Sequence, residues 1–217
     1  MPQSISYEKK DVIFSLLNRF RNYLSFLPSR PVTKKKLFNT PEEVIEEASS
    51  VNIESEVRFS KQRLEDLTTD LKDINNRLSV AKRLEPLGFE LEIFNNTVIS
   101  SYVIEKVSDE IENVFKKQLK DPYIIKLDDL SFVISILRSE ESSLARLVSE
   151  LGLQMIHVPE MEGNPTNYRK SLEERLNSVK EQINSVMNSL EDISNRYYEK
   201  IAIIGEGLEI ETKKLEI

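Results

Sequence analysis

The chain has 217 residues, of which 39% are hydrophobic and 31% charged, a balance typical of a folded chain rich in regular structure. It contains no Cys, which excludes disulfides and thiol chemistry, and a single His, His157, which excludes sites built from several imidazoles. The formal net charge of −7 disfavours a general attraction to nucleic acid or anionic lipid. We therefore expect a protein that is not an enzyme, with no catalytic residues, no cofactor and no metal.

The charge is uneven along the chain. Residues 1–36 carry eight basic and two acidic side chains, so the remainder has a balance of −13. No apolar stretch reaches the roughly 18 residues that a membrane-spanning helix needs, and the N-terminus lacks the order of a signal peptide. We expect a soluble chain on the cytoplasmic side of the membrane.

The first predicted element is a helix over residues 7–27, because its apolar residues recur every three or four positions (Val12, Ile13, Leu16, Leu17, Phe20, Leu24 and Leu27). Pro28 ends it. Residues 29–39 are expected to form an exposed connection, so 1–39 is an N-terminal helix with a basic linker. Arg19, Arg21 and the run Lys34-Lys35-Lys36 offer contacts to lipid headgroups or to an acidic partner, although a solvated loop is the default interpretation.

Thr40-Pro41-Glu42-Glu43 is a helix start signal, since a Thr cap, a Pro at the first position and a following Glu satisfy the free amides. We expect a helix from Pro41 to Pro86 without interruption, roughly 45 residues or on the order of 65 Å long. Its apolar residues alternate spacings of three and four, with Ser60 at one vacant position (Val57, Leu64, Leu67, Leu71, Ile74, Leu78 and Ala81). Residues 40–87 are therefore predicted to be the first helix of a coiled coil.

A second run, residues 162–217, repeats these features. Asn164-Pro165 is the start signal, and the same alternation continues without interruption until Gly205 (Leu172, Leu176, Val179, Ile183, Val186, Leu190, Ile193 and Tyr197). Antiparallel pairing of the two runs sets Ala81 near Tyr168 and Leu64 near Ile183 or Val186; the alternative is two long helices in separate bundles. The apolar residues that continue to Ile217 are expected to pair with the first helix in a short three-helix end.

Residues 88–161 differ in character and are predicted to form an inserted lobe. Strands are expected at 97–104, 123–128, 130–137 and 153–158, with helices at 107–119 and 140–151, the second closed by Gly152. The order βαββαβ is that of a ferredoxin-like sandwich. Residues 89–94 are expected to cover a sheet edge or the junction with the coil. The predicted fold class is α+β: a long antiparallel two-helix coiled coil with a ferredoxin-like lobe.

No motif for catalysis is found. Glu140-Glu141 and Glu173-Glu174 are interpreted as helix-start carboxylates, Asp128-Asp129 as a hairpin turn, and His157 as a structural or surface residue. The loop at Asn95-Asn96 lacks the Gly and Arg of a phosphate-binding loop. The two central strands offer one Tyr and one Phe, Tyr102 and Phe132, which is too little for stacking single-stranded RNA, so nucleic acid is not expected as a partner.

Two junction motifs carry a family resemblance. Arg83-Leu84-Glu85-Pro86-Leu87-Gly88 with Phe89-Glu90-Leu91 lies where the coil enters the lobe, and Glu150-Leu151-Gly152-Leu153 with the residues from His157 to Pro165 lies where it returns. The arrangement resembles the N-terminal cytoplasmic half of the membrane subunit of archaeal and vacuolar-type rotary ATPases, called subunit I or subunit a. The resemblance covers about residues 11–217, and the heptads between the motifs add no weight.

The resemblance implies a non-catalytic stator that links the peripheral stalks, coils of subunits E and G or H, to the membrane sector that carries protons. It also implies that the rotor ring is contacted only by the C-terminal membrane half. We expect the chain to be truncated at both ends, without part of the membrane-proximal lobe before Met1 and without the transmembrane helices after Ile217. The alternative is another coiled-coil scaffold of the prefoldin or condensin kind, whose lobe serves dimerisation or client binding.

Overall fold

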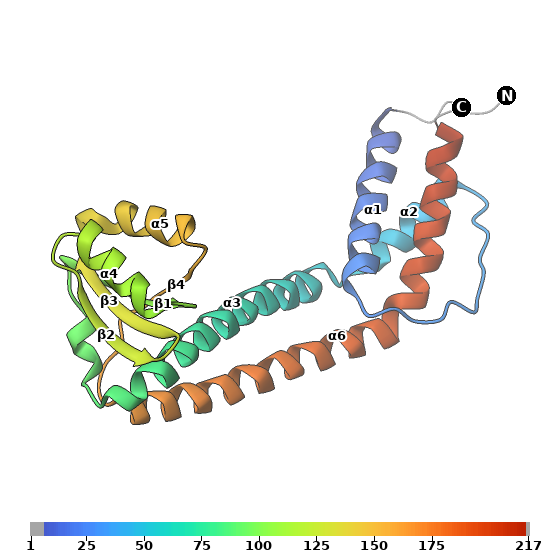
Figure 1. Cartoon of the computed structure of the whole chain (residues 1–217). Coiled ribbons are helices and arrows are strands. Elements are labelled where there is room, and N and C mark those ends of the chain that lie inside the picture. The colour runs from blue at the N-terminus through green and yellow to red at the C-terminus, as the bar shows by residue number, and fades with distance from the viewer. Residues whose placement is uncertain (1–6, 216–217) are drawn as a thin grey trace. The chain divides into compact units, whose positions relative to one another are not determined.

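A computed structural model of the chain describes residues 7–215. The chain divides into two compact units, which we call the helical unit (Met1–Thr68 with Glu181–Ile217) and the lobe unit (Thr69–Lys180). Two long helices, α3 (Glu54–Leu84) and α6 (Pro165–Leu215), contribute residues to both units (Figure 1). Each unit has its own hydrophobic core.

The helical unit is built from α1 (Tyr7–Phe26), α2 (Pro41–Ser50), the start of α3 and the C-terminal part of α6. Ile13 and Phe20 of α1 share one core with Ile204 and Leu208 of α6, and all four are fully buried. The predicted pairing of the first helix with the apolar end of the chain is therefore confirmed for the described residues. Ile217, which the same prediction includes, lies outside them.

The helix expected from Pro41 to Pro86 is interrupted, so this prediction is wrong. Thr40 caps α2 as expected, its side chain accepting a hydrogen bond from the Glu43 N–H, but α2 ends at Ser50 and α3 begins at Glu54. Val51 and Ile53 lie in the break and are almost fully buried in the core of the helical unit. Burial of two β-branched side chains thus outweighs the continuity of the helix, a choice that local propensity does not reveal.

The apolar alternation of the second run is expected to continue without interruption until Gly205, and the helix itself extends past this residue. Helix α6 continues through Gly205 and Gly207 to Leu215. A Cβ atom at Gly207 would lie 2.5 Å from Cδ2 of Phe38, so the missing side chain makes room for the ring. These glycines therefore permit close approach within a helix instead of ending it.

Helices α3 and α6 lie side by side along the predicted apolar stripes. Leu64 and Val186 contribute to the core of the helical unit, as the antiparallel pairing requires. Within the lobe unit, Ile74 and Leu78 of α3 are buried, as are Leu172 and Val179 of α6. Tyr168 packs against the core that contains Val80 and Leu84, in the turns of α3 around Ala81.

The lobe contains one four-stranded antiparallel sheet with the order β2-β3-β1-β4. Its elements follow the predicted order βαββαβ: β1 (Ile99–Glu105), α4 (Asp109–Gln118), β2 (Tyr123–Asp128), β3 (Ser131–Leu137), α5 (Glu141–Glu150) and β4 (Gln154–His157). Short 3-10 turns, η1 (Glu85–Leu87), η2 (Leu91–Phe94) and η3 (Arg138–Glu140), precede β1 and α5. The turn after α5 contains Gly152 at a φ of 65°, the left-handed conformation that the sequence assigns to it.

Both faces of this sheet are covered. Tyr102, Phe132 and Ile134 point into a core that they share with Phe115 of α4 and Leu144 of α5. The alternating residues Val103 and Val133 point to the other face, where they meet a second core formed with α3 and η2 (Val80, Leu84, Leu91, Phe94, Val158 and Met161). Residues 89–94 thus lie at the junction, where the Leu91 N–H donates to the Gly163 carbonyl at 3.0 Å.

Candidate interaction surfaces

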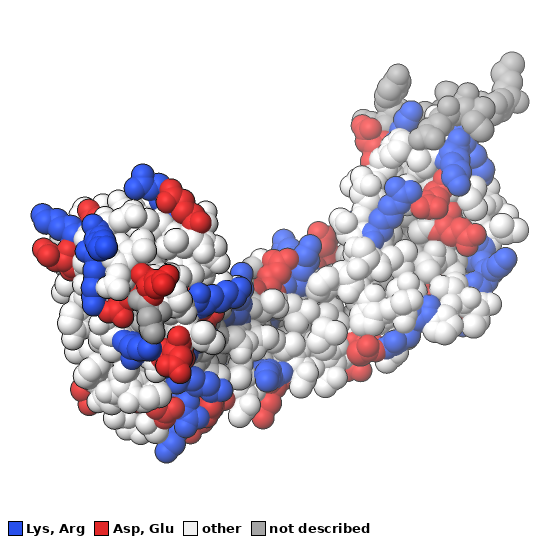
Figure 2. Space-filling model, in the orientation of Figure 1, with Lys and Arg blue, Asp and Glu red and all other residues white. Residues whose placement is uncertain are grey.

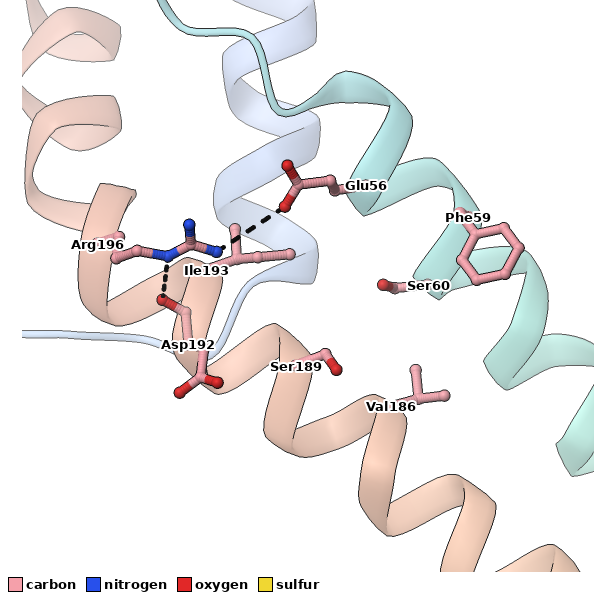
Figure 3. A pocket seen from close by; sticks show the side chains of 8 residues that line it. All are labelled: Glu56, Phe59, Ser60, Val186, Ser189, Asp192, Ile193 and Arg196. Atoms are coloured by element: carbon pink, nitrogen blue, oxygen red, sulfur yellow. Dashed lines mark hydrogen bonds and ion pairs between the residues drawn. The ribbon is translucent and has the colours of Figure 1, made fainter.

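The helical unit contains a groove of about 370 Å³ between the start of α3 and the middle of α6 (Figure 3). Eight residues line it: Glu56, Phe59, Ser60, Val186, Ser189, Asp192, Ile193 and Arg196. Three of them come from α3 and five from α6, at helical spacings that place each set on one side of its helix. The groove is therefore a product of the small residues Ser60 and Ser189 on adjacent helices.

The groove combines an exposed aromatic ring with hydroxyl and charged side chains. Phe59 is 72% exposed, an unusual position for an aromatic residue on a helix that is otherwise polar. Arg196 lies 3.9 Å from Glu56 and donates from Nε to the carbonyl of Asp192 at 3.3 Å. The lining includes hydroxyls and carboxylates but no imidazole, and Figure 3 shows Ser60 and Ser189 away from the charged groups.

A second surface of the helical unit is the connection between α1 and α2, which the sequence correctly predicts to be exposed. The Glu199 carboxylate of α6 binds it: Oε1 accepts hydrogen bonds from the Thr33 N–H and hydroxyl, both at 2.8 Å, and from the Lys34 N–H at 3.0 Å. These donors, first the Thr33 amide, lower the pKa of Glu199 to about 2. Glu199 therefore accepts these hydrogen bonds as an ionised carboxylate at neutral pH.

Lysines 34–36 and Lys200 surround a hollow of about 380 Å³ beside this clamp, together with Glu47, Glu199 and Ile203. The other basic residues that the sequence analysis considers for lipid contact are used within the unit. Arg21 bonds to Glu209 at 2.9 Å, while Arg19 donates to the Ala48 carbonyl and lies 3.8 Å from Glu54. Of the basic residues considered for lipid contact, Lys34, Lys35 and Lys36 are those that share one exposed loop.

The lobe surface carries Lys and Arg interspersed with Asp and Glu on the face drawn in Figure 2. Tyr102 and Phe132 are not on this surface. The ring of Phe132 packs edge-on against Phe115 at 5.6 Å, and Tyr102 packs against the His157 ring at 5.2 Å. Because both aromatic residues face the lobe helices and the opposite face is covered by η2 and α3, the sheet offers no stacking platform for RNA.

The carboxylates noted in the sequence have structural partners. Glu141 lies in the first turn of α5, as expected, and accepts hydrogen bonds from the Ser100 hydroxyl, the main cause of its lowered pKa. Asp128 caps the β2–β3 turn by accepting from the Leu130 N–H at 2.8 Å. The prediction that Glu173 lies at a helix start is wrong, because it lies beyond the first turn of α6 and pairs with Arg169 at 2.8 Å.

Asn95 and Asn96 serve the backbone around them. The Asn95 amide both donates to the Met161 carbonyl at 2.7 Å and accepts from the Met161 N–H at 3.0 Å, joining the two junction segments. Asn96 accepts from the N–H groups of Val98 and Ile99 before β1. These loops are therefore occupied by structural hydrogen bonds.

Within residues 7–215, no group of three or more His, Cys, Asp or Glu side chains is placed to hold a metal ion. Over the same residues, no helix combines the length and apolar character that crossing a membrane demands.

Sequence reasoning missed three features of these surfaces: the exposed Phe59, the Glu199 clamp and the approach of Phe38 to Gly207. Phe59 lies next to Ser60, which occupies a position of the apolar stripe. Its own position falls outside the three-and-four spacing of that stripe, and this is the sequence signal that it is exposed. Two glycines within a helical pattern are a signal of close contact with another segment. The Glu199 clamp has no local signal, because its donors lie 165 and 166 residues away.

The described residues define a mixed helix-and-sheet protein with a four-stranded antiparallel sheet and a long C-terminal helix. Among solved structures, the chain is similar to the crystal structure of the cytoplasmic N-terminal domain of subunit I, the homolog of subunit a, of V-ATPase. The match has a TM-score of 0.66 and 16% sequence identity, and covers 98% of this chain and 74% of that chain. The resemblance inferred from the junction motifs is thus confirmed as a shared fold.

No family model matches the sequence, and no curated protein matches it.

Proposed function

We propose that the chain is a non-catalytic stator component of a rotary ATPase of the archaeal or vacuolar type, equivalent to the cytoplasmic part of subunit I or a. The observation that carries this proposal is the fold shared with the subunit I domain over 98% of the chain. The two junction motifs support it independently, because the resemblance that they carry rests on residue identity and not on the fold.

The junction motifs have physical tasks at the base of the lobe. Pro86 lies in η1, the turn that follows α3, and Gly88 closes this turn at a φ of 66°, while Leu84 is buried against the sheet. On the return segment Gly163 has a φ of 77° and its carbonyl accepts from Leu91. Arg169 lies 3.0 Å from Glu85 and joins the two sides. Residues of the two junction motifs therefore contribute to a single connection between the long helices and the lobe.

The mechanical part of the proposal concerns α3 and α6. We take α3 (Glu54–Leu84) and α6 (Pro165–Leu215) as the two helices of an antiparallel coiled coil and residues 88–161 as a ferredoxin-like lobe. A stator must resist shear, and paired helices with a narrow buried stripe supply stiffness with few residues. Exposed ion pairs between the helices, such as Arg175 with Asp70 at 2.6 Å, set their register more than their stability.

The partners in this proposal are the peripheral stalk subunits E and G or H, bound through the lobe, on the cytoplasmic side of the membrane. The proposal assigns contact with the rotor ring to the membrane half of such a subunit. The lobe helices α4 and α5 present acidic residues, among them Glu110 and Glu150, both exposed. We assign them to basic segments of the stalk.

The test is co-purification of the 217-residue chain with the stalk heterodimer. Glu110→Lys combined with Glu150→Lys is expected to weaken the complex by on the order of tenfold, because like charges then oppose each other. The matched control is Glu174→Lys with Glu181→Lys, two exposed acidic residues of α6, which should leave binding unchanged. Failure of the unmodified chain to bind the heterodimer contradicts the stator role, whereas equal binding by both pairs contradicts the lobe contact alone.

A further inference from the structure

The loop between α1 and α2 has an uncommon composition. Residues 32–37, Val-Thr-Lys-Lys-Lys-Leu, set three consecutive lysines between two apolar residues, and we call this segment the basic loop. Leu37 is 85% exposed and Val32 is 47% exposed. The loop therefore presents two apolar side chains to solvent beside a run of lysines.

The basic loop is held in place by contacts on both sides. Glu199 binds Thr33 and Lys34 through three hydrogen bonds, as described above. On the N-terminal side, Ser194 donates to the Pro28 carbonyl and Arg30 donates to Asn195 at 2.7 Å. On the C-terminal side Phe38 is seated against Gly207. The apolar side chains are therefore presented outward by a fixed backbone, which reduces the entropy cost of binding.

The three lysines of the basic loop differ in their ion pairs. Lys34 is 79% exposed although it lies 3.7 Å from Glu199, and Lys36 is shared between Glu43 and Glu47. Lys35 has no partner among the described residues. Lys200 lines the same hollow and donates to the Ser50 hydroxyl at 3.1 Å.

We propose that the basic loop docks on the surface of an anionic lipid membrane, with Leu37 and Val32 in the interfacial region and the lysines among the headgroups. Lysine is a flexible point charge that suits a diffuse negative surface, whereas recognition of a single shaped anion favours the fork of arginine. The neighbouring apolar residues distinguish this loop from a purely electrostatic tract. The proposal stands on the helical unit alone and does not require the stator role.

The test is flotation of the 217-residue chain with vesicles of phosphatidylcholine containing about one third phosphatidylglycerol, compared with pure phosphatidylcholine. Binding is expected to the anionic vesicles alone and to weaken as the salt rises from about 0.1 M to about 0.5 M. Replacing Lys34, Lys35 and Lys36 by Ala should reduce partitioning by on the order of a hundredfold, at about fivefold for each lysine. Leu37→Ser should reduce it about tenfold.

Two matched controls separate this site from general effects. Replacing Lys61, Lys72 and Lys180 by Ala removes three exposed lysines of α3 and α6 and should leave partitioning within about twofold, because they lack apolar neighbours in a loop. Leu130→Ser removes another exposed leucine, 66% exposed, and should have no effect. Circular dichroism of each variant verifies that it is folded.

Equal binding to neutral and anionic vesicles, or equal losses in the test and control variants, would overturn the proposal. So would lysine-dependent binding of single-stranded RNA with no binding to vesicles. Because stalk binding is assigned to the lobe, the triple lysine variant should still co-purify with the stalk heterodimer, which keeps the two proposals separable.

Discussion

Phe38 lies where a side chain at position 207 would be. A Cβ atom on Gly207 would come within 2.6 Å of both Cδ2 and Cε2 of the Phe38 ring and within 3.1 Å of Cγ2 of Val44. The linker between α1 and α2 is thus seated on α6 at a glycine, and Lys36 lies 5.0 Å from the centre of the same ring. One missing methyl group determines where this connection crosses the helix.

Gly207→Ala is expected to destabilise the helical unit. Alanine favours a helix interior by about 1 kcal/mol over glycine, but the clash with a packed aromatic ring costs about 1–3 kcal/mol. Gly205→Ala is the control, because its nearest neighbour is Leu24 at 3.7 Å, and it should stabilise by about 0.5–1 kcal/mol. Urea unfolding measures both, and a gain in stability for Gly207→Ala contradicts the packing.

The Glu199 clamp predicts a pH dependence. Its pKa is depressed from the usual 4.5 to about 2 in the folded chain, so its contribution to stability is complete above about pH 4.5 and is lost as the pH falls towards 2. Glu199→Gln should therefore lower the Tm at pH 7, and the difference from the unmodified chain should shrink over that acid range. Glu206→Gln, an exposed neighbour on α6, should show no such difference. A constant difference between pH 7 and pH 2 contradicts the assignment.

Because η2 covers the second face of the sheet, a substitution in this short turn is expected to lower the stability of the lobe unit strongly. Leu91 of η2 is fully buried against Val103 and Val133, so Leu91→Ala should destabilise the lobe unit by about 2–5 kcal/mol. Ile93 of the same turn is 57% exposed, and Ile93→Ala should change the free energy of unfolding by less than about 0.5 kcal/mol. Equal effects in chemical unfolding would mean that η2 does not cover the sheet.

The pair Arg83 and Glu105 joins the end of α3 to β1. The Glu105 side chain is 18% exposed and one carboxylate oxygen is buried, whereas Glu112 and Lys116 form an ordinary pair on α4. Glu105→Gln should cost about 1–3 kcal/mol, because it leaves Arg83 partly buried without its counter-charge. Glu112→Gln should cost about 0.3–0.5 kcal/mol. Thermal unfolding at low and high salt distinguishes them, since only the surface pair is strongly screened.

Local signals predicted most of the lobe correctly. The apolar run in Ser131–Leu137 reflects a strand buried on both faces, and the helical spacing in α4 and α5 reflects burial on one side of each helix; both patterns are visible in the sequence. The strand boundaries moved by one or two residues. The side of the sheet that each aromatic residue faces was not visible, because it depends on which helices cover which face.

The candidate surfaces were predicted less completely. The lysine run was seen as an exposed segment, since three lysines between prolines and a cap have no apolar stripe to bury. Its anchoring by Glu199 was not, because a carboxylate and its donors can be 165 residues apart without any periodic relation. The groove beside Phe59 forms where α3 and α6 pack together, so the sequence of either helix alone does not predict it.

The sequence by itself determined the order of the elements, the two apolar stripes, the insertion of the lobe and the motifs at its base, because each is written in residues close together along the chain. Tertiary structure decided the break at Val51–Ile53, the passage of α6 through its glycines and the cover on the second face of the sheet. In each case a local conformational preference competes with the burial of side chains that are distant in sequence. The free energy of that burial depends on tertiary contacts, so the sequence near each site does not reveal which effect is larger.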